Sequence, residues 1–153
     1  MKVSAQEEYG LRCLLQLARV PQGQLVTVKE IGERESLSSA YVEKLLRLLG
    51  RAELVHSSRG MHGGYALNRA PSQVTLGEVV RALGTIETTD HICNSFTGSR
   101  DVCVHFNGCS LRSVWSGLTT YIQRFLDETT LEDLASEYTV SERLAKRLTG
   151  GVV

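Results

Sequence analysis

Three cysteines lie close together in the carboxy-terminal half of the sequence, at Cys93, Cys103 and Cys109. Thiolates are soft ligands that hold iron-sulfur clusters and zinc in proteins. Structural zinc sites favour cysteines two to four residues apart, whereas nine residues separate the first two of these cysteines and five separate the last two. The spacing therefore favours an iron-sulfur cluster, of the 2Fe-2S or 4Fe-4S type, over the alternatives of a zinc site or free reactive thiols.

One ligand place stays open, because a cluster of either type normally takes four ligands from the protein. His91 and His105 are close in sequence and chemically suited to this place. The fourth cysteine, Cys13, lies beside Leu14 in an apolar helical pattern, where a free cysteine behaves as a small buried hydrophobic residue. We therefore expect Cys13 to belong to the core.

Charge is balanced over the whole chain but not within its halves. Residues 1–69 carry ten basic against seven acidic residues, and residues 70–153 carry seven against ten. The amino-terminal half is thus the better candidate for contact with a polyanion. The first twenty residues contain five charged residues and no signal-peptide core, and no apolar run approaches the roughly 20 residues that span a bilayer. We expect a cytoplasmic protein.

Apolar residues at helical spacing predict three helices, over residues 8–20, 27–32 and 38–52. Thr27 and Glu30 form a capping-box pattern at the start of the second, and Ser38 or Ser39 can cap the third. Two short strands follow, over residues 54–57 and 65–67, joined by a glycine-rich turn over residues 59–64. This order predicts a mainly α fold with a small β-hairpin, the winged helix-turn-helix.

A second capping box, Thr75 with Glu78, predicts a further helix that ends at Gly84. A long helix over residues 111–126 carries a broad apolar stripe that needs a partner surface, and Thr130 starts a short helix. We predict a DNA-binding domain over 1–84, a cysteine-rich loop over 85–110, a dimerisation helix with the following short helix over 111–140, and a tail over 141–153.

The third helix would enter the major groove of DNA, since the second helix of a helix-turn-helix pair does so. Its first turns would offer side chains to base edges: Ser39, Ala40, Tyr41, Glu43 and Lys44. Arg47 and Arg51 would contact phosphates, and Arg59 in the hairpin turn would enter the minor groove. The alternative is a solvated helix face with no ligand.

Four segments resemble the Rrf2 (Rrf-two) family of bacterial regulators, which includes the IscR, NsrR and RirA types. They are residues 9–12 (YGLR), 39–43 (SAYVE), 54–55 (LV) and 59–67 (RGMHGGYAL). The resemblance reaches to about Tyr138. It implies a homodimer paired through the long helix and bound to an imperfect inverted repeat, and it gives Glu43 a part in base recognition.

The resemblance also implies an iron-sulfur cluster on Cys93, Cys103 and Cys109, although the family leaves five to seven residues in each gap. The IscR type has a histidine three residues after the last cysteine, where this chain has Arg112. Other members use a carboxylate from the opposite subunit, which would be Glu8 here; His91 and His105 remain the alternatives. We expect a homodimeric regulator that senses redox, nitric oxide or iron status.

No enzyme is expected, because the chain has no Cys-x-x-Cys pair, nucleophile elbow or convincing phosphate loop. The alternative function is a DNA-binding regulator whose loop holds structural zinc or no metal and which responds to another signal.

Overall fold

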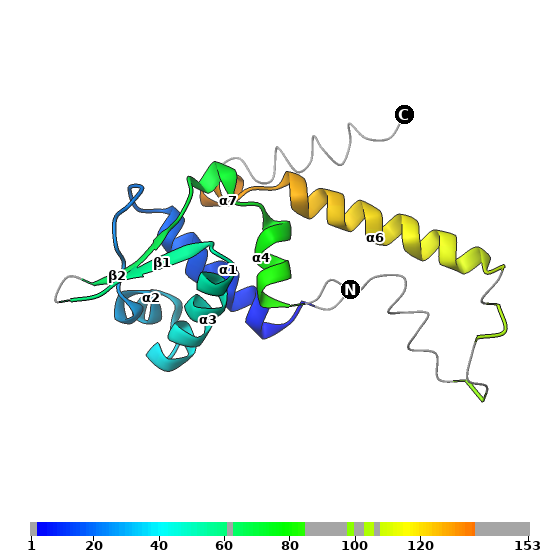
Figure 1. Ribbon diagram of the computed structural model, residues 1–153, viewed down its shortest axis with the longest axis horizontal. Coiled ribbons are helices and arrows are strands. Elements are labelled where there is room, and N and C mark those ends of the chain that lie inside the picture. The colour runs from blue at the N-terminus through cyan, green and yellow to red at the C-terminus, as the bar shows by residue number, and fades with distance from the viewer. Residues whose placement is uncertain (1–2, 61–62, 85–97, 100–102, 106–107, 137–153) are drawn as a thin grey trace.

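The structure is a computed structural model that describes residues 3–60, 63–84, 98–99, 103–105, 108–109 and 110–136. Its elements are α1 (Ala5–Ala18), α2 (Val28–Glu35), α3 (Ser39–Arg51), β1 (Val55–Ser58), β2 (Gly64–Leu67), the short 3-10 helix η1 (Pro71–Gln73), α4 (Leu76–Leu83), α6 (Ser110–Glu128) and α7 (Leu131–Ala135). Elements α1 to α4 and α7 gather with the hairpin into a head, and α6 extends away from it (Figure 1). The predicted winged helix is confirmed, with a long helix beside it.

Four helices begin with a reciprocal capping box, in which a hydroxyl and a carboxylate satisfy backbone amides that the helix itself leaves free. The pairs are Ser4 with Glu7, Thr27 with Glu30, Thr75 with Glu78, and Thr130 with Asp133. Two of these were predicted. The box at Ser4 was not, and it explains why α1 begins at Ala5, before the predicted start at residue 8.

The turn between α2 and α3 depends on a close backbone approach at Gly32. A Cβ atom there would lie 2.7 Å from the carbonyl oxygen of Leu37, whose amide donates to the Gly32 carbonyl at 2.9 Å. Ser36 ends α2 in the left-handed conformation, with φ of 55°. This tight turn sets the angle at which α3 leaves α2.

The wing is the antiparallel hairpin of β1 and β2, in which Val55 pairs with Leu67 and Ser58 with Gly64. The strands were predicted over residues 54–57 and 65–67, so β1 is shifted by one residue and β2 begins one residue earlier. Tyr65 also pairs with Val26 in an isolated bridge, and a Cβ atom at Gly64 would lie 2.7 Å from the Val26 carbonyl oxygen. The hairpin is therefore fastened to the segment before α2.

The elements of the head share one apolar core, which includes Leu131 of α7. Two backbone hydrogen bonds hold the segment after α6 against the start of α4: the Leu76 amide donates to the Thr129 carbonyl at 2.8 Å, and the Leu131 amide donates to the Val74 carbonyl at 2.9 Å. In contrast, no residue of α6 is buried. Within the described residues, no helix is long and apolar enough to cross a membrane.

Candidate nucleic-acid interface and cysteine region

The inner face of α3 is fixed by four fully buried residues, Val42, Leu45, Leu46 and Leu49. Their burial turns the predicted reading residues outward: Ser39, Ala40, Glu43, Lys44, Arg47 and Arg51 are exposed, and Tyr41 is half-buried. The Ser38 hydroxyl caps the helix start by accepting from the Tyr41 amide at 3.3 Å. The predicted α3 residues thus lie on the outer side of the helix, with Tyr41 less accessible than the others.

Two of the charged side chains on α3 are held by neighbours on the same helix. Arg47 donates to the Glu43 carboxylate at 2.8 Å, and the Lys44 ammonium lies 6.0 Å from the centre of the Tyr41 ring. A carboxylate reads DNA by accepting from the amino group of cytosine, but it is repelled by the phosphates. Arg47 partly neutralises the charge of Glu43, which would lower the electrostatic cost of bringing this carboxylate near a polyanion.

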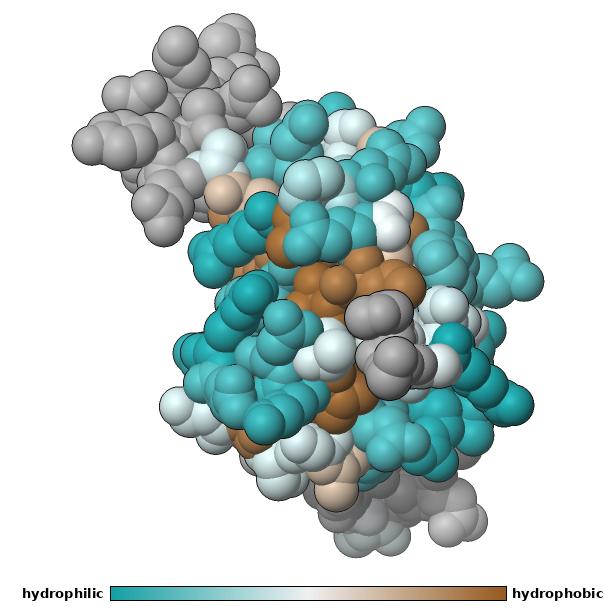
Figure 2. Space-filling view, turned by 90° about the vertical axis from the view of Figure 1, so that its left-hand side faces the viewer, coloured by the Kyte–Doolittle hydropathy of each residue, from teal (hydrophilic) through white to brown (hydrophobic). Residues whose placement is uncertain are grey.

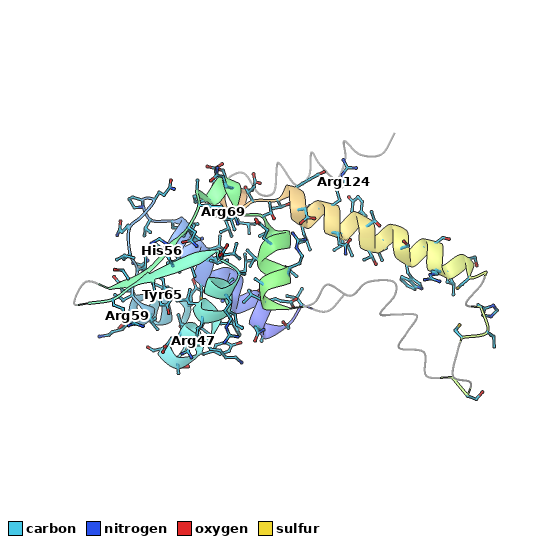
Figure 3. All side chains as sticks on the ribbon, viewed as in Figure 1. Arg47, His56, Arg59, Tyr65, Arg69 and Arg124 are labelled. Carbon is cyan, nitrogen blue, oxygen red and sulfur yellow. The ribbon has the colours of Figure 1, made fainter. Side chains whose placement is uncertain are left out.

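The wing adds a second cationic position on the same head. Arg59 is exposed and precedes Gly60, whose φ of 114° turns the chain; Figure 3 shows Arg47 and Arg59 along the same lower edge in that view. The end of the molecule shown in Figure 2 is mainly hydrophilic, with one hydrophobic patch near its centre. The predicted list omitted His56, which is exposed on β1 and lies 2.7 Å from Asn68 through Nδ1.

Glu8, the predicted fourth cluster ligand, is exposed and already has a partner. Its carboxylate accepts from Arg12 at 2.9 Å, and the Arg12 guanidinium also lies 3.9 Å from Glu35 and 5.6 Å from the centre of the Tyr9 ring. The Tyr9 ring in turn meets Tyr41 of α3 edge to face at 6.2 Å. Tyr9, the residue that follows Glu8 on α1, therefore contacts α3.

The described cysteines differ sharply in environment. Cys13 has no exposed surface, and burial, with a smaller effect from the charge of Glu35, raises the pKa of its thiol from 9.0 to about 12. Cys103 and Cys109 are half-buried free thiols, and Cys109 is the residue before the first turn of α6. The prediction that Cys13 belongs to the core is confirmed.

Cys93 and His91 lie outside the described residues. His105 is exposed, in a turn closed by the Gly108 amide at 3.1 Å from its carbonyl oxygen. Among the residues that the structure does describe, no three His, Cys, Asp or Glu side chains come together as a metal site. The donor set still suits a thiolate-bound cluster, because Cys103 and Cys109 are soft donors and both are partly accessible.

Glu8 and Cys109 of one chain lie at different places in the molecule. Glu8 is on α1 in the head, whereas Cys109 is at the end of α6 that points away from the head (Figure 1). A helix of 19 residues is about 28 Å long. A shared site for these two residues therefore requires a second subunit, as the resemblance implies.

The comparisons with known proteins agree with this geometry over nearly the whole chain. The model of the Rrf2 family, described as an iron-dependent transcriptional regulator, matches residues 3–137. The chain belongs to the Rrf2 family. It is therefore a DNA-binding transcription regulator and not an enzyme, as predicted.

Individual Rrf2 members are similar in sequence and in structure. The protein rrf2 of Nitratidesulfovibrio vulgaris is 34% identical over 134 residues, which cover 88% of this chain and 87% of that protein. The structure of CymR, titled the global cysteine regulator of B. subtilis, has a TM-score of 0.73 at 33% identity, covering 89% of this chain and 97% of CymR. IscR of T. potens has a TM-score of 0.69 at 32% identity, covering 88% and 85%.

Proposed function

We propose that this Rrf2 regulator binds an imperfect inverted repeat as a homodimer, and that an iron-sulfur cluster on Cys93, Cys103 and Cys109 sets its affinity for DNA. The observation that carries the proposal is α6, which presents an uncovered apolar face and has Cys109 at its outer end. One helix would thus serve both pairing and sensing.

A second copy of the chain is the partner that fits α6. The exposed large apolar residues are Leu111, Val114, Trp115, Leu118 and Tyr121, each between 42% and 62% exposed. They recur every three or four residues and so share one side of the helix. A self-complementary stripe of this kind is typical of a two-fold interface, in which the same surface serves both subunits.

The DNA-reading part of the proposal uses the exposed side chains of α3 and the wing. Ser39, Ala40, Tyr41, Glu43 and Lys44 would meet base edges, and Arg47 and Arg51 would meet phosphates. Arg59 would enter the minor groove, where a narrow A·T tract attracts arginine. Two heads of one dimer would place these residues on half-sites about 34 to 36 Å apart.

The cluster would supply a redox-active, oxygen- and nitric oxide-sensitive centre. Cys93, Cys103 and Cys109 would hold it, with Glu8 of the partner subunit as the fourth ligand and His91 or His105 as the alternatives. Glu8 is held by Arg12 at 2.9 Å, so ligation would release Arg12 from this carboxylate. Because Arg12 also contacts Tyr9, which meets Tyr41 of α3, such a release would be felt at the reading helix.

A second candidate keeps the DNA-binding function and drops the cluster. The similarity to CymR, a protein titled as a cysteine regulator, favours a loop that carries structural zinc or no metal and answers to a thiol metabolite. Both candidates use the same fold, and they differ in what the thiols bind.

Anaerobic purification separates the two candidates. We expect a brown protein with bound iron and sulfide, and a change in its DNA affinity after exposure to oxygen or nitric oxide. Cys109→Ala should abolish the colour, and Glu8→Ala should alter the visible spectrum or its lifetime more than His105→Ala does. Cys13→Ala is the matched control and should keep the cluster. A colourless protein with stoichiometric zinc, or with no metal, would establish the second candidate.

Pairing through α6 is tested on the same preparations. Leu118→Asp places a charge on the apolar face, where unpaired burial of a carboxylate is costly, and should convert the dimer to a monomer in sedimentation experiments. Arg124→Ala removes a charge from the same helix without touching the apolar stripe and should remain dimeric. Dimeric Leu118→Asp protein would place the interface elsewhere.

A further inference from the structure

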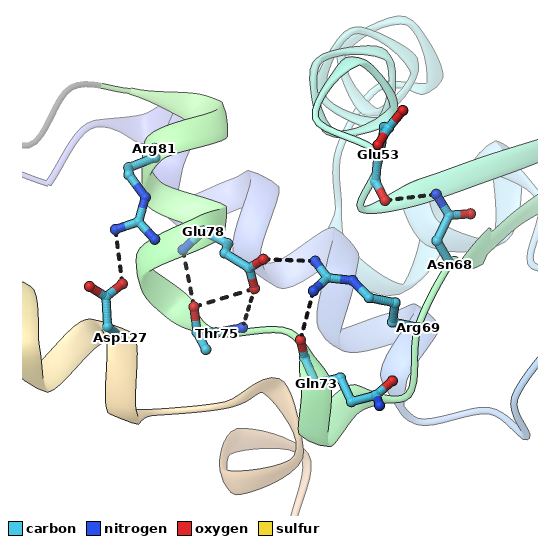
Figure 4. Close-up of polar contacts among 8 residues, drawn as sticks. All are labelled: Glu53, Asn68, Arg69, Gln73, Thr75, Glu78, Arg81 and Asp127. Carbon is cyan, nitrogen blue, oxygen red and sulfur yellow. Dashed lines mark hydrogen bonds and ion pairs between the residues drawn. The ribbon is translucent and has the colours of Figure 1, made fainter.

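An ion pair joins α6 to α4, and Gly77 of α4 has no side chain that would obstruct it. Arg81 of α4 donates to the Asp127 carboxylate of α6 at 2.8 Å. A Cβ atom added at Gly77 would lie 1.9 Å from Oδ1 of Asp127 and 3.0 Å from Nη1 of Arg81. Glycine therefore leaves the room that the Asp127 carboxylate occupies beside α4 (Figure 4 draws the ion pair).

Backbone hydrogen bonds fasten the same junction on its other side. Thr75 and Thr130 form an antiparallel bridge, and the Leu76 amide donates to the carbonyl of Thr129 at 2.8 Å. The chain that leaves α6 is thus tied to the start of α4. With contacts both before and after its last residue, α6 meets the head at one defined angle.

The start of α4 is connected in turn to the DNA-reading elements. Arg69, which follows β2, donates to Glu78 of α4 at 2.8 Å and to the carbonyl of Gln73 at 3.0 Å. Its neighbour Asn68 donates to the carbonyl of Glu53, just after α3, at 2.7 Å. Figure 4 shows three separate groups of contacts: Arg81 with Asp127, Arg69 and Thr75 with Glu78 and Gln73, and Asn68 with Glu53. Because Asn68 and Arg69 are neighbours in sequence, the last two groups connect the start of α4 to the wing and to the end of α3.

We propose that Gly77, Arg81 and Asp127 are positioning residues, which set the angle between α6 and the head and thereby the half-site spacing that the dimer accepts. The inference rests on the proposed dimer through α6. Arg81 and Asp127 are each about half exposed, and exposed ion pairs contribute little to stability. Their contribution is therefore expected in geometry rather than in the melting temperature.

The space at Gly77 is occupied by the Asp127 carboxylate. Ordinary contact would require the Cβ atom of an alanine and Oδ1 of Asp127 to separate by about 1.5 Å more than the 1.9 Å available. Because this oxygen is the end of a side chain that is about half exposed, the carboxylate can turn aside, which takes it away from Arg81. Gly77→Ala should therefore loosen the contact between α4 and α6 and reduce discrimination between spacers.

The test uses a duplex selected by the wild-type dimer from a fully randomised pool, then rebuilt with its spacer one or two base pairs longer or shorter. We expect Gly77→Ala to reduce discrimination between spacers, although alanine is the better helix former. Asp127→Ala should reduce discrimination between spacers at least fivefold. Asp127→Asn keeps the shape and one acceptor and should stay within twofold of wild type.

Arg124→Ala is the matched control, because Arg124 pairs with Glu128 within α6 at 2.7 Å and should leave the spacer profile unchanged. Sedimentation must show every variant to be dimeric. Dimeric Gly77→Ala and Asp127→Ala proteins with the wild-type spacer profile, or an equal effect of Arg124→Ala, would overturn the positioning role of Gly77, Arg81 and Asp127 and leave the proposed dimer intact. A monomeric wild-type protein would overturn both the proposed dimer and this positioning role.

Discussion

The environment of Cys13 predicts that this thiol is almost inert in the folded protein. At pH 8 a thiol with a pKa of 9.0 is about one-tenth thiolate, whereas a thiol with the value of about 12 that burial gives Cys13 is about one ten-thousandth thiolate. The reactive species is the thiolate. Alkylation of Cys13 should therefore be about a thousandfold slower than that of an ordinary cysteine, before its lack of exposed surface slows it further.

Iodoacetamide labelling of the cluster-free protein, followed by peptide mass spectrometry, measures this ratio directly. Cys103 and Cys109 serve as internal references because they are partly accessible, and in denaturant all sites should react alike. In the proposed cluster-bound form, these two thiols should be protected and Cys13 should be unchanged. Native-state labelling of Cys13 within tenfold of Cys103 would refute the reasoning from burial.

The same shift makes stability depend on alkaline pH. The folded pKa of Cys13 lies above the value of 9.0 for the exposed thiol, so its contribution is complete below pH 9 and declines as the pH rises from 9 toward 12. The expected decline is about 1.4 kcal/mol per pH unit, or up to about 4 kcal/mol over the interval. Urea unfolding measures it, and Cys13→Ala should lack this component.

Three further outcomes are expected. Gly32→Ala should lower the free energy of unfolding by about 1 to 3 kcal/mol in urea, because its Cβ atom would press on the Leu37 carbonyl. Burial raises the pKa of Glu78, but hydrogen bonds from Thr75 and Arg69 outweigh this effect, and the net pKa is lowered. The stabilising contribution of Glu78 is therefore present above pH 4.5 and should be lost on further acidification. Thermal melts between pH 6 and 3 would measure this loss. Glu43→Ala should relax selection for a C·G pair in the randomised pool by about 1 to 3 kcal/mol and leave the half-site spacing unaltered.

Local signals were sufficient to predict the winged helix from the sequence. Thr27 with Glu30 and Thr75 with Glu78 mark helix starts by type and spacing alone, and the structure forms both capping boxes. The wing followed from glycines between two short β patterns. These features depend on residues within a few positions of one another, which is why a single sequence reveals them.

Features that join distant segments could not be predicted in this way. Nothing in the sequence pairs Arg81 with Asp127, which are 46 positions apart, or shows that Gly77 makes room for that carboxylate. The bridge of Val26 to Tyr65 is another such contact. For the candidate site, Cys103 and Cys109 stay predicted ligands, whereas the pair of Glu8 with Arg12 is local, four positions apart on a predicted helix, and could have been predicted from the sequence.

The exposure of α6 has a consequence for how DNA binding depends on the concentration of the protein. A lone amphipathic helix of this length is marginally stable in water, and α6 buries none of its residues within its own chain. In the proposed dimer, the apolar face of α6 would be covered only on association, so the amount of DNA-binding protein would rise with the square of the monomer concentration until pairing is complete. The rate at which a cell makes this regulator would then act as an input of its own, alongside the signal proposed for its thiols.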